Sequence, residues 1–380
     1  MKSLLAPSLL SALWVSALGC DSGRVQIADP ASLPATQVVP TVPDYGLALR
    51  SASLRLLGTL PTLSEIKQLQ TENDQRSFLH QRVEAYVQDP RFVFAQREFF
   101  RNTFRTGGTP MTDTAPTFAA AVVAQDRPFT DVLLAQSGTC PQLQEDGSVR
   151  SADCKNGIPA VGVLTDPGLQ AQLYSSMAFR RVRWVQETFL CRKFPAENGG
   201  RREEHPSGTY FSPWEFTSIS GLRTDRSARI DFHADDKGEL CANCHSTMNH
   251  IAPLLAGFDQ NGQFIGMKDG AYPVLTPVPG SPPTRRQDFL PDSEPTAWRF
   301  GQPTADLQAL GQAIAADEDM AKCMATRVWN WALSRGDAVS DEATLPPELA
   351  SQLARDFKRS GYSVKRLIRQ IFATDAFIRY

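Results

Sequence analysis

Hydrophobic residues recur at the spacing of a helix along most of this 380-residue chain. In the clearest case, apolar residues follow Ser363 at positions i, i+3, i+4, i+7 and i+8, which is typical of an amphipathic helix with a serine N-cap. Its members are Val364, Leu367, Ile368, Ile371 and Phe372. Met324, Val328 and Trp331 form a second stripe. The pattern predicts two amphipathic helices near the C-terminus.

The first half of the chain shows the same periodicity. Thr62 and Glu65 have the spacing of a capping box, and Asp89 stands before a proline in the arrangement of an N-cap followed by proline at the first helical position. Further helices are expected over 128–136 and 167–191. Strand–helix alternation is absent from the sequence. We therefore expect a mainly α fold, in which the chain's 27 prolines lie in long loops between helices.

A short motif in the middle of the chain indicates the cofactor chemistry of the protein. Cys241, Cys244 and His245 lie in the run E-L-C-A-N-C-H, which has the spacing of a c-type haem attachment site. The two thiols can form thioether bonds to the vinyl groups of a haem, while the imidazole binds the iron from one face. We expect one covalent haem c, held by Cys241 and Cys244, with His245 as the proximal iron ligand.

The second axial ligand of the iron has three candidates. His233 ranks first, because a turn after it could fold its imidazole over the open face of the haem. The alternative for His233 is a surface histidine beside a helix. Met267 ranks second and His250 third. Met248 lies on the same helical face as His245, so we expect it to pack against the macrocycle rather than to coordinate the iron.

Two other kinds of site use the same residues. Cys241, Cys244, His245 and His250 could supply two thiolates and two imidazoles to a structural zinc, but adjacent cysteine and histidine make tetrahedral geometry awkward. A C-x-x-C dithiol of the redox-enzyme type normally occurs in a βαβ context, which this sequence lacks. Both alternatives are less favoured than haem.

The N-terminus indicates where the protein is located. Lys2 precedes an apolar stretch over 4–18, which is too short to span a bilayer with ease. The stretch ends in the letters S-A-L-G-C, which resembles the lipobox of bacterial lipoproteins, although Ala17 stands where that family prefers leucine. Cys20 would then be the lipidated first residue. The alternative is an ordinary signal peptide. We expect an extracytoplasmic protein of the bacterial cell envelope, anchored to the inner or outer membrane.

Composition and cysteine usage fit this location. The chain is 42% hydrophobic and 21% charged, with a formal net charge of −2 and no basic stripe, so nothing suggests a nucleic-acid partner. Cys140 and Cys154 flank a polar loop and are expected to form a disulfide in an oxidising compartment. Cys191 and Cys323 either form a second bridge or remain as buried thiols.

These observations divide the chain into six segments. Residues 1–19 form a signal peptide, 20–44 a lipidated flexible tether, 45–197 an N-terminal helical module, 198–270 a haem-binding segment, 271–300 a Pro-rich linker and 301–380 a C-terminal helical module. The linker is expected to wrap around the protein with few regular elements, because its proline density leaves little room for helices or strands.

The residues after the C-x-x-C-H run match a longer motif, roughly C-x-x-C-H-x-x-M-D-P-x-G-F-x-x-E-x-F-D-x-x-G. The matching positions are Cys241, Cys244, His245, Met248, Phe258, Asp259 and Gly262. The departures are Asn249-His250, Ala252-Pro253 and Ala256. The segment resembles uncharacterised planctomycete-type and myxobacterial cytochrome-c-like families, which consist of domains of unknown function around a haem segment.

Three further blocks resemble the same families. They are residues 54–92 in the N-terminal module, 190–195 before the haem segment, and 323–336 with 374–377 in the C-terminal module. The resemblance therefore covers most of the chain after the tether. It implies helical modules around a haem segment, but no reaction, because the families themselves have no established one.

The leading functional hypothesis is a membrane-anchored monohaem c-type cytochrome that exchanges electrons with a redox partner protein. One alternative is a haem-dependent oxidase or peroxidase acting on a small molecule or carbohydrate. That enzyme would need an acid–base group near the haem, for which Asp235, Asp236 and Glu239 are candidates, although they fit a solvated turn equally well. A second alternative is an interaction module with a structural haem. The sequence identifies no catalytic residue.

Overall fold

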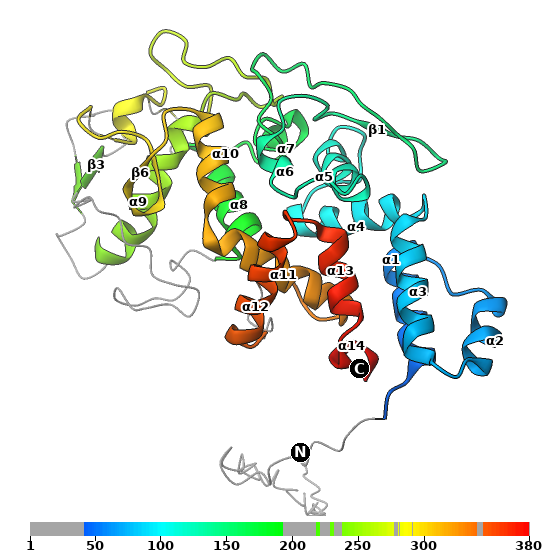
Figure 1. Ribbon diagram of the computed structural model, residues 1–380. Helices are drawn as coiled ribbons and strands as arrows, with labels where there is room; N and C mark the ends of the chain where they lie inside the picture. Colours follow the sequence, from blue (N-terminus) through cyan, green and yellow to red (C-terminus); the bar gives the residue numbers. More distant parts are fainter. Residues whose placement is uncertain are drawn as a thin grey trace, which may run out of the picture. The chain divides into compact units, whose positions relative to one another are not determined.

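The structure is a computed structural model and describes residues 42–192, 218–220, 229–231, 238–276, 280, 282–290, 292–339 and 345–379 (Figure 1). Cys20 and His233 lie outside the described residues, as do the expected signal peptide and most of the expected tether. The described residues belong to one unit, 42–380. None of the helices in these ranges combines the length and apolar character that a membrane span requires.

The described residues form mainly helices, which confirms the expected fold class. In chain order they are α1 (Tyr45–Leu57), α2 (Leu63–Thr71), α3 (Gln75–Gln88), α4 (Phe92–Phe104), α5 (Thr114–Ala124), α6 (Asp131–Leu134), α7 (Pro167–Gln172), α8 (Phe179–Leu190), α9 (Gly238–Leu255), α10 (Leu307–Ala316), α11 (Glu318–Ala332), α12 (Pro347–Arg359), α13 (Val364–Phe372) and α14 (Asp375–Ile378).

The strands in the described ranges are short antiparallel pairs. They are β1 (Gln142–Leu143) with β2 (Val149–Arg150), β3 (Ser218–Ser220) with β4 (Arg229–Asp231), and β5 (Ala297–Trp298) with β6 (Gln302–Pro303). Between α9 and α10 the proline-rich stretch contains two 3₁₀ turns, η3 (Arg286–Asp288) and η4 (Arg299–Gly301). The described residues of this stretch form only these short elements.

Local sequence signals fix several helix ends. The backbone N–H of Glu65 donates to Thr62 Oγ1 (3.2 Å) and the Thr62 N–H donates to the Glu65 carboxylate (2.8 Å), so the predicted capping box is present. Ser363 Oγ accepts from the backbone N–H of Arg366 (3.2 Å) and caps α13. The apolar stripe that follows Ser363 is completely buried. Both features were predicted because they depend only on residues a few positions apart.

Two expected helices differ from the structure. Asp89 does not cap α4, because its carboxylate accepts a hydrogen bond from the backbone N–H of Arg91 (2.8 Å) in a tight turn, and the helix begins at Phe92. The helix expected over 128–136 shortens to the single turn of α6. In both places, residues that the sequence pattern assigned to a helix lie in a turn between neighbouring helices.

The long helix expected over 167–191 is broken into α7 and α8. Met177 (φ 52°) and Ala178 (φ 57°) adopt left-handed backbone conformations, which a right-handed helix cannot include. The Met177 N–H donates to the carbonyl of Leu275 (3.2 Å), almost a hundred residues further along the chain. This contact with a distant segment outweighs the local preference for a continuous helix.

An aromatic core joins helices that are far apart in sequence. Phe99 on α4 lies 5.3 Å from Trp331 on α11 between ring centroids, and Phe104 lies 5.7 Å from Trp184 on α8. The Trp184 Nε1–H donates to the carbonyl of Phe104 (3.0 Å). The N-terminal and C-terminal helical segments therefore share one core instead of forming independent modules.

Two disulfides add covalent links to this core. Cys140 is joined to Cys154 beside the β1–β2 hairpin, with a Cα–Cα distance of 5.0 Å. Cys191, directly after α8, is joined to Cys323 in the middle of α11, with a Cα–Cα distance of 5.2 Å. Both pairings are those considered from the sequence.

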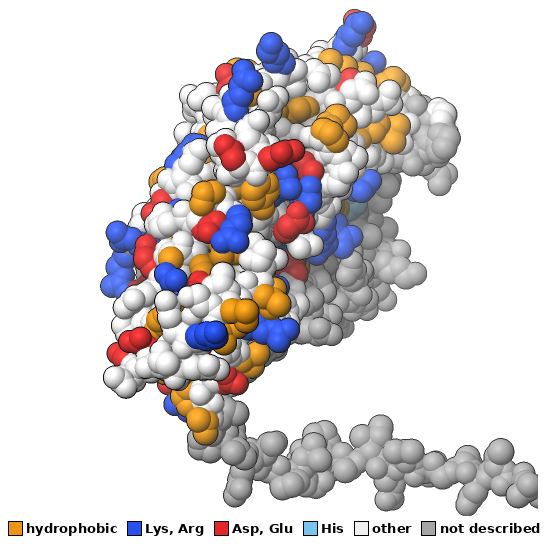
Figure 2. All heavy atoms as spheres, turned by 90° about the vertical axis from the view of Figure 1, so that its right-hand side faces the viewer, with side chains coloured by type: hydrophobic (Ala, Val, Ile, Leu, Met, Phe, Trp, Pro, Cys, Tyr) orange, Lys and Arg blue, Asp and Glu red, His pale blue; other side chains and the backbone are white. Residues whose placement is uncertain are grey.

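Charged side chains are mixed over the visible surface. On the face shown in Figure 2, basic and acidic side chains alternate with apolar ones, and no extended area of one sign is present among the described residues. Ion pairs such as Arg76–Asp375 and Arg369–Glu84 link distant segments at the surface. Exposed pairs of this kind contribute little to stability. The fold therefore depends mainly on the aromatic core and the disulfides.

Candidate haem-binding site

The C-x-x-C-H run lies on α9 (Figure 1). The helix begins at Gly238, so positions 241 and 244 fall one turn apart in its first half and position 245 follows directly. The side chains of Cys241 and Cys244 lie outside what the structure describes. The helix supplies the regular backbone on which an attachment motif of this spacing is presented.

The imidazole of His245 is oriented by a buried amide. His245 Nδ1 lies 3.0 Å from Asn249 Oδ1, four residues further along α9. Asn249 is fully buried, and its Nδ2 donates to the carbonyl of Phe289 (2.8 Å). Because the amide nitrogen must face that carbonyl, the amide oxygen faces His245 and accepts a hydrogen bond from its Nδ1–H. In the neutral ring the lone pair then lies on Nε2, the nitrogen through which such a tautomer coordinates a metal.

The surroundings of His245 also favour a neutral ring. Its imidazole packs edge-on against Phe179, with 5.4 Å between ring centroids. Burial lowers the pKa of His245, and the hydrogen bond with Asn249 opposes that effect only in part. A neutral imidazole is the form that binds a metal, so the donor chemistry of this residue fits a proximal haem ligand.

His250, the third candidate for the second axial ligand, pairs with a carboxylate in the structure. It is 1% exposed, and its Nε2 lies 2.9 Å from Glu294 Oε2. A ring nitrogen occupied by a carboxylate is engaged in a structural pair. This geometry argues against His250 as an iron ligand and against a zinc site that would need it.

Met267 lies towards the other end of α9. It is 52% exposed and lines a cavity of about 370 Å³ together with Leu254 and Gly257. Leu254 lies nine residues after His245, which is about 14 Å along a helix axis. Met267 is therefore badly placed to coordinate the same iron as His245. Met248 is half-buried and packs against the hydrophobic core.

A buried arginine holds the C-terminal end of α9. Arg181 on α8 donates from Nη1 to the carbonyls of Leu255 (2.9 Å) and Phe258 (3.1 Å), and from Nη2 to the carbonyl of Gln170 (2.8 Å). A cation at the end of a helix is favourable because the last carbonyls carry partial negative charge. Arg181 thus fixes the helix that carries His245.

Neither Asn249 nor Arg181 was predicted from the sequence, although the position of each within its helix indicates a role. Asn249 lies at i+4 from His245, a spacing at which helical side chains meet. Arg181 lies at i−4 from Val185, so it is a charged residue on the buried face of a helix. A charge on an apolar face indicates a specific set of partners, which the sequence alone did not identify.

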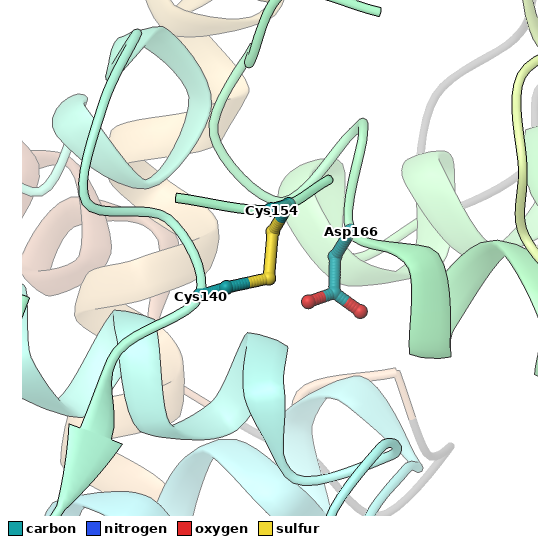
Figure 3. Close-up of side chains that lie close together, drawn as sticks. All are labelled: Cys140, Cys154 and Asp166. Carbon is teal, nitrogen blue, oxygen red and sulfur yellow. A yellow bond between two sulfur atoms is a disulfide. The ribbon is translucent and has the colours of Figure 1, made fainter. Parts of the chain in front are cut away.

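A second cluster of polar groups surrounds the Cys140–Cys154 disulfide. Figure 3 shows the Asp166 carboxylate beside it, and the ligand atoms of the three residues lie within 4.8 Å of one another. The sulfur atoms are bonded to each other, so they are not thiolates and do not form a metal site. Asp166 is 1% exposed, and its Oδ1 accepts from the Leu169 N–H (2.7 Å), which caps α7.

Burial raises the pKa of Asp166 to about 7, because its Oδ2 has no hydrogen-bond partner and the two backbone N–H groups facing the carboxylate compensate only in part. The folded protein therefore holds this proton at pH values where the unfolded chain has released it. The resulting contribution to stability is present below pH 4 and is lost as the pH rises to about 7.

Replacing Asp166 with asparagine should remove this pH dependence. The amide keeps an oxygen for the Leu169 N–H and carries no charge, so Asp166→Asn is expected to stabilise the protein by about 2–4 kcal/mol at pH 8 and by almost nothing at pH 4. Urea unfolding at pH 4, 6 and 8 measures the difference, with the exposed Glu145→Gln as control. A loss of stability that is equal at all three pH values would contradict the raised pKa.

Comparison with known families assigns one part of the chain. Residues 300–377 match a family described as "Protein of unknown function (DUF1585)", which is associated with cytochrome-c-like proteins. This stretch is DUF1585-like. The DUF1585 match covers helices α10 to α14 and includes Cys323. No curated protein and no solved structure matches the chain.

Proposed function

We propose that this protein is an extracytoplasmic monohaem c-type cytochrome of the bacterial cell envelope that passes electrons to or from a partner protein. Cys241 and Cys244 would hold the haem covalently, and His245 would bind its iron. A haem held in this way supplies a one-electron carrier, while the protein sets its orientation and electrostatics. Lipid on Cys20 would keep the protein at the membrane.

The hydrogen-bond chain from His245 through Asn249 to the carbonyl of Phe289 carries this proposal. Histidines that bind metals almost always donate their other ring N–H to an acceptor, which fixes the tautomer and the angle of the ring. Asn249 provides such an acceptor and is itself held in one orientation. A histidine with only a packing role would not need a buried amide dedicated to its Nδ1.

Two further observations support the proposal. Disulfides persist in oxidising compartments outside the cytoplasm, where c-type haem is attached, and the described residues contain two. The DUF1585 match is independent of the haem motif, because it begins well after His245 and yet belongs to a family associated with cytochrome-c-like proteins. His233 stays the first candidate for the second axial ligand, and two histidine ligands would give a low reduction potential.

Expression of the whole chain with the c-type haem maturation machinery tests the attachment. The intact mass is expected to exceed the polypeptide mass by one haem, and Cys241→Ala with Cys244→Ala should remove the increment completely. The matched control is Cys140→Ala with Cys154→Ala, which also removes two sulfurs but should keep the haem. A native product without covalent haem would overturn the proposal.

Spectra of the same preparations test the electron-transfer role. A six-coordinate, low-spin reduced form that ignores carbon monoxide supports an electron carrier, whereas a high-spin form that binds it and consumes peroxide would contradict this role. Asn249→Leu should keep the covalent haem, because both thioether bonds remain, but should shift the reduction potential as the Nδ1 hydrogen bond is lost. An unchanged potential would show that Asn249 does not act on the iron ligand.

A further inference from the structure

We propose that the Cys140–Cys154 disulfide is a redox-active bond, which an external dithiol opens while the Asp166 carboxyl supplies a proton to the departing sulfur. Figure 3 shows the carboxylate beside the disulfide, and one of its oxygens lies within 4.8 Å of both sulfurs. A single bridging water spans such a distance, so a proton can pass from the carboxyl to a thiolate. The three residues lie outside α9, and the inference does not depend on haem.

The Asp166 carboxyl has the properties of a proton donor. It is 1% exposed, and its Oδ2 has no hydrogen-bond partner, whereas Oδ1 accepts from the backbone N–H of Leu169. Burial raises its pKa to about 7, and no charged side chain among the described residues contributes to the shift. A free cysteine thiol has a pKa of about 8.5. Transfer of the carboxyl proton to a newly formed thiolate is therefore favourable.

A buried hydroxyl group identifies Cys154 as the departing sulfur. Thr139 is 1% exposed, and its Oγ1 donates to Cys154 Sγ at 3.4 Å. A hydrogen bond to this sulfur stabilises the negative charge that develops there, and a leaving thiol of lower pKa departs faster. The attacking thiolate therefore forms its bond with Cys140, and the electron pair of the S–S bond moves to Cys154.

The exchange consumes one dithiol in two steps. First, a thiolate of the dithiol forms a bond to Cys140 Sγ, the bond to Cys154 breaks, and Cys154 Sγ receives the proton of Asp166, which solvent then replaces. Second, the other thiolate of the reductant attacks its own sulfur in this mixed disulfide and releases Cys140, which takes a proton from solvent. The dithiol loses two electrons and becomes a disulfide, while the protein gains two thiols.

The neighbouring hairpin is expected to keep the two cysteines together after reduction. Strand β1 pairs with β2, and the Cys140 N–H donates to the carbonyl of Ala152 (2.9 Å). These backbone contacts do not involve the sulfurs, so opening the bond leaves them in place. Both cysteines are half-buried, so part of each residue is in contact with solvent. The site can therefore cycle between its two forms without unfolding of the protein.

The second disulfide lacks these features and provides a comparison within the same molecule. Cys323 is 4% exposed. Among the residues that the structure describes, no carboxylate or imidazole lies within 4.8 Å of both sulfurs of the Cys191–Cys323 bond. We therefore expect a dithiol to open this bond more slowly.

Timed reduction of the purified full chain with dithiothreitol tests the proposal. Samples are quenched with N-ethylmaleimide, and the labelled cysteines are identified by peptide mass spectrometry. At pH 6 the Cys140–Cys154 bond should open about ten times faster than the Cys191–Cys323 bond, or more. The assay follows cysteine labelling and not haem, so its outcome is independent of the proposed function.

The pH dependence of one variant separates proton donation from an effect on stability. At pH 6 Asp166→Asn should slow the opening of the Cys140–Cys154 bond about tenfold or more, because the amide donates no proton to the sulfur. This difference should shrink towards pH 8.5, where Asp166 itself has lost its proton. An effect through stability alone would grow as the pH rises, because the buried charge then destabilises the native protein. The matched control is Asp153→Asn, since Asp153 is exposed and precedes Cys154; it should leave the rate unchanged.

Two further arms test the departing sulfur and the source of the dithiol. Thr139→Val should slow the opening, whereas Thr139→Ser keeps the hydroxyl group and should restore it. With reduced thioredoxin in place of dithiothreitol, faster opening assigns the dithiol to a C-x-x-C protein and slower opening to a small molecule. Equal rates for the two disulfides, or a difference between native protein and Asp166→Asn that grows with pH, would overturn the proposal.

Discussion

Replacing Arg181 with methionine is expected to lower the free energy of unfolding by about 3–5 kcal/mol, because it breaks a buried hydrogen-bond network. Arg181 is 1% exposed, and its guanidinium reaches the carbonyls of Gln170, Leu255 and Phe258 at 2.8–3.1 Å. Methionine fills much of the same volume but donates no hydrogen bond. Three buried carbonyls would then lose a donor at once.

The charge of Arg181 is stabilised from two further sides. Its Cζ lies 5.7 Å from the ring centroids of Tyr174 and Phe258, a distance at which aromatic faces attract a cation. Burial lowers the pKa of Arg181 to about 10, so the side chain still carries its charge at neutral pH. Arg181→Lys should therefore recover only part of the stability, since a lysine has the charge but not the planar fork.

Urea unfolding of the full chain measures this effect. The matched control is Arg180→Met, because Arg180 is the neighbouring residue on α8 and is exposed; a change below about 0.5 kcal/mol is expected there. If both substitutions had the same small effect, the network around Arg181 would not contribute to stability as proposed. Intact mass of the Arg181 variant would also show whether α9 still accepts haem when its C-terminal end is loosened.

Removing the disulfide between Cys191 and Cys323, by replacing both with alanine, is expected to destabilise the protein by about 5 kcal/mol in the chain-entropy model. The bond joins residues 132 positions apart in sequence, so it strongly restricts the unfolded chain. It also connects the end of α8 to α11, and thus the helix of Arg181 to the DUF1585 match.

The second disulfide provides a matched comparison. Cys140 and Cys154 are separated by 14 positions, so the same model gives about 3 kcal/mol for their removal. Denaturant unfolding of the two double-alanine variants is measured without reducing agent. Removal of the Cys191–Cys323 bond should lower the free energy of unfolding by about 2 kcal/mol more than removal of the Cys140–Cys154 bond. Equal losses would show that local packing around each bond, rather than loop closure, determines the effect.

Sequence alone determined the features that depend on near neighbours. The capping box at Thr62, the serine cap and apolar stripe of α13, and the mainly helical class follow from residues within one or two turns of each other. The C-x-x-C-H spacing is local as well, which is why the sequence alone indicates the proposed cofactor and the residues that would hold it.

Only the tertiary structure decided the rest, because it depends on segments that meet after folding. The backbone of Leu275 fixes the break between α7 and α8, and Glu294 engages His250. Phe289 orients Asn249 from forty residues away, and Arg181 joins three segments. No local pattern encodes these partners, since a buried polar group is satisfied by whichever distant donor or acceptor the packing brings within reach.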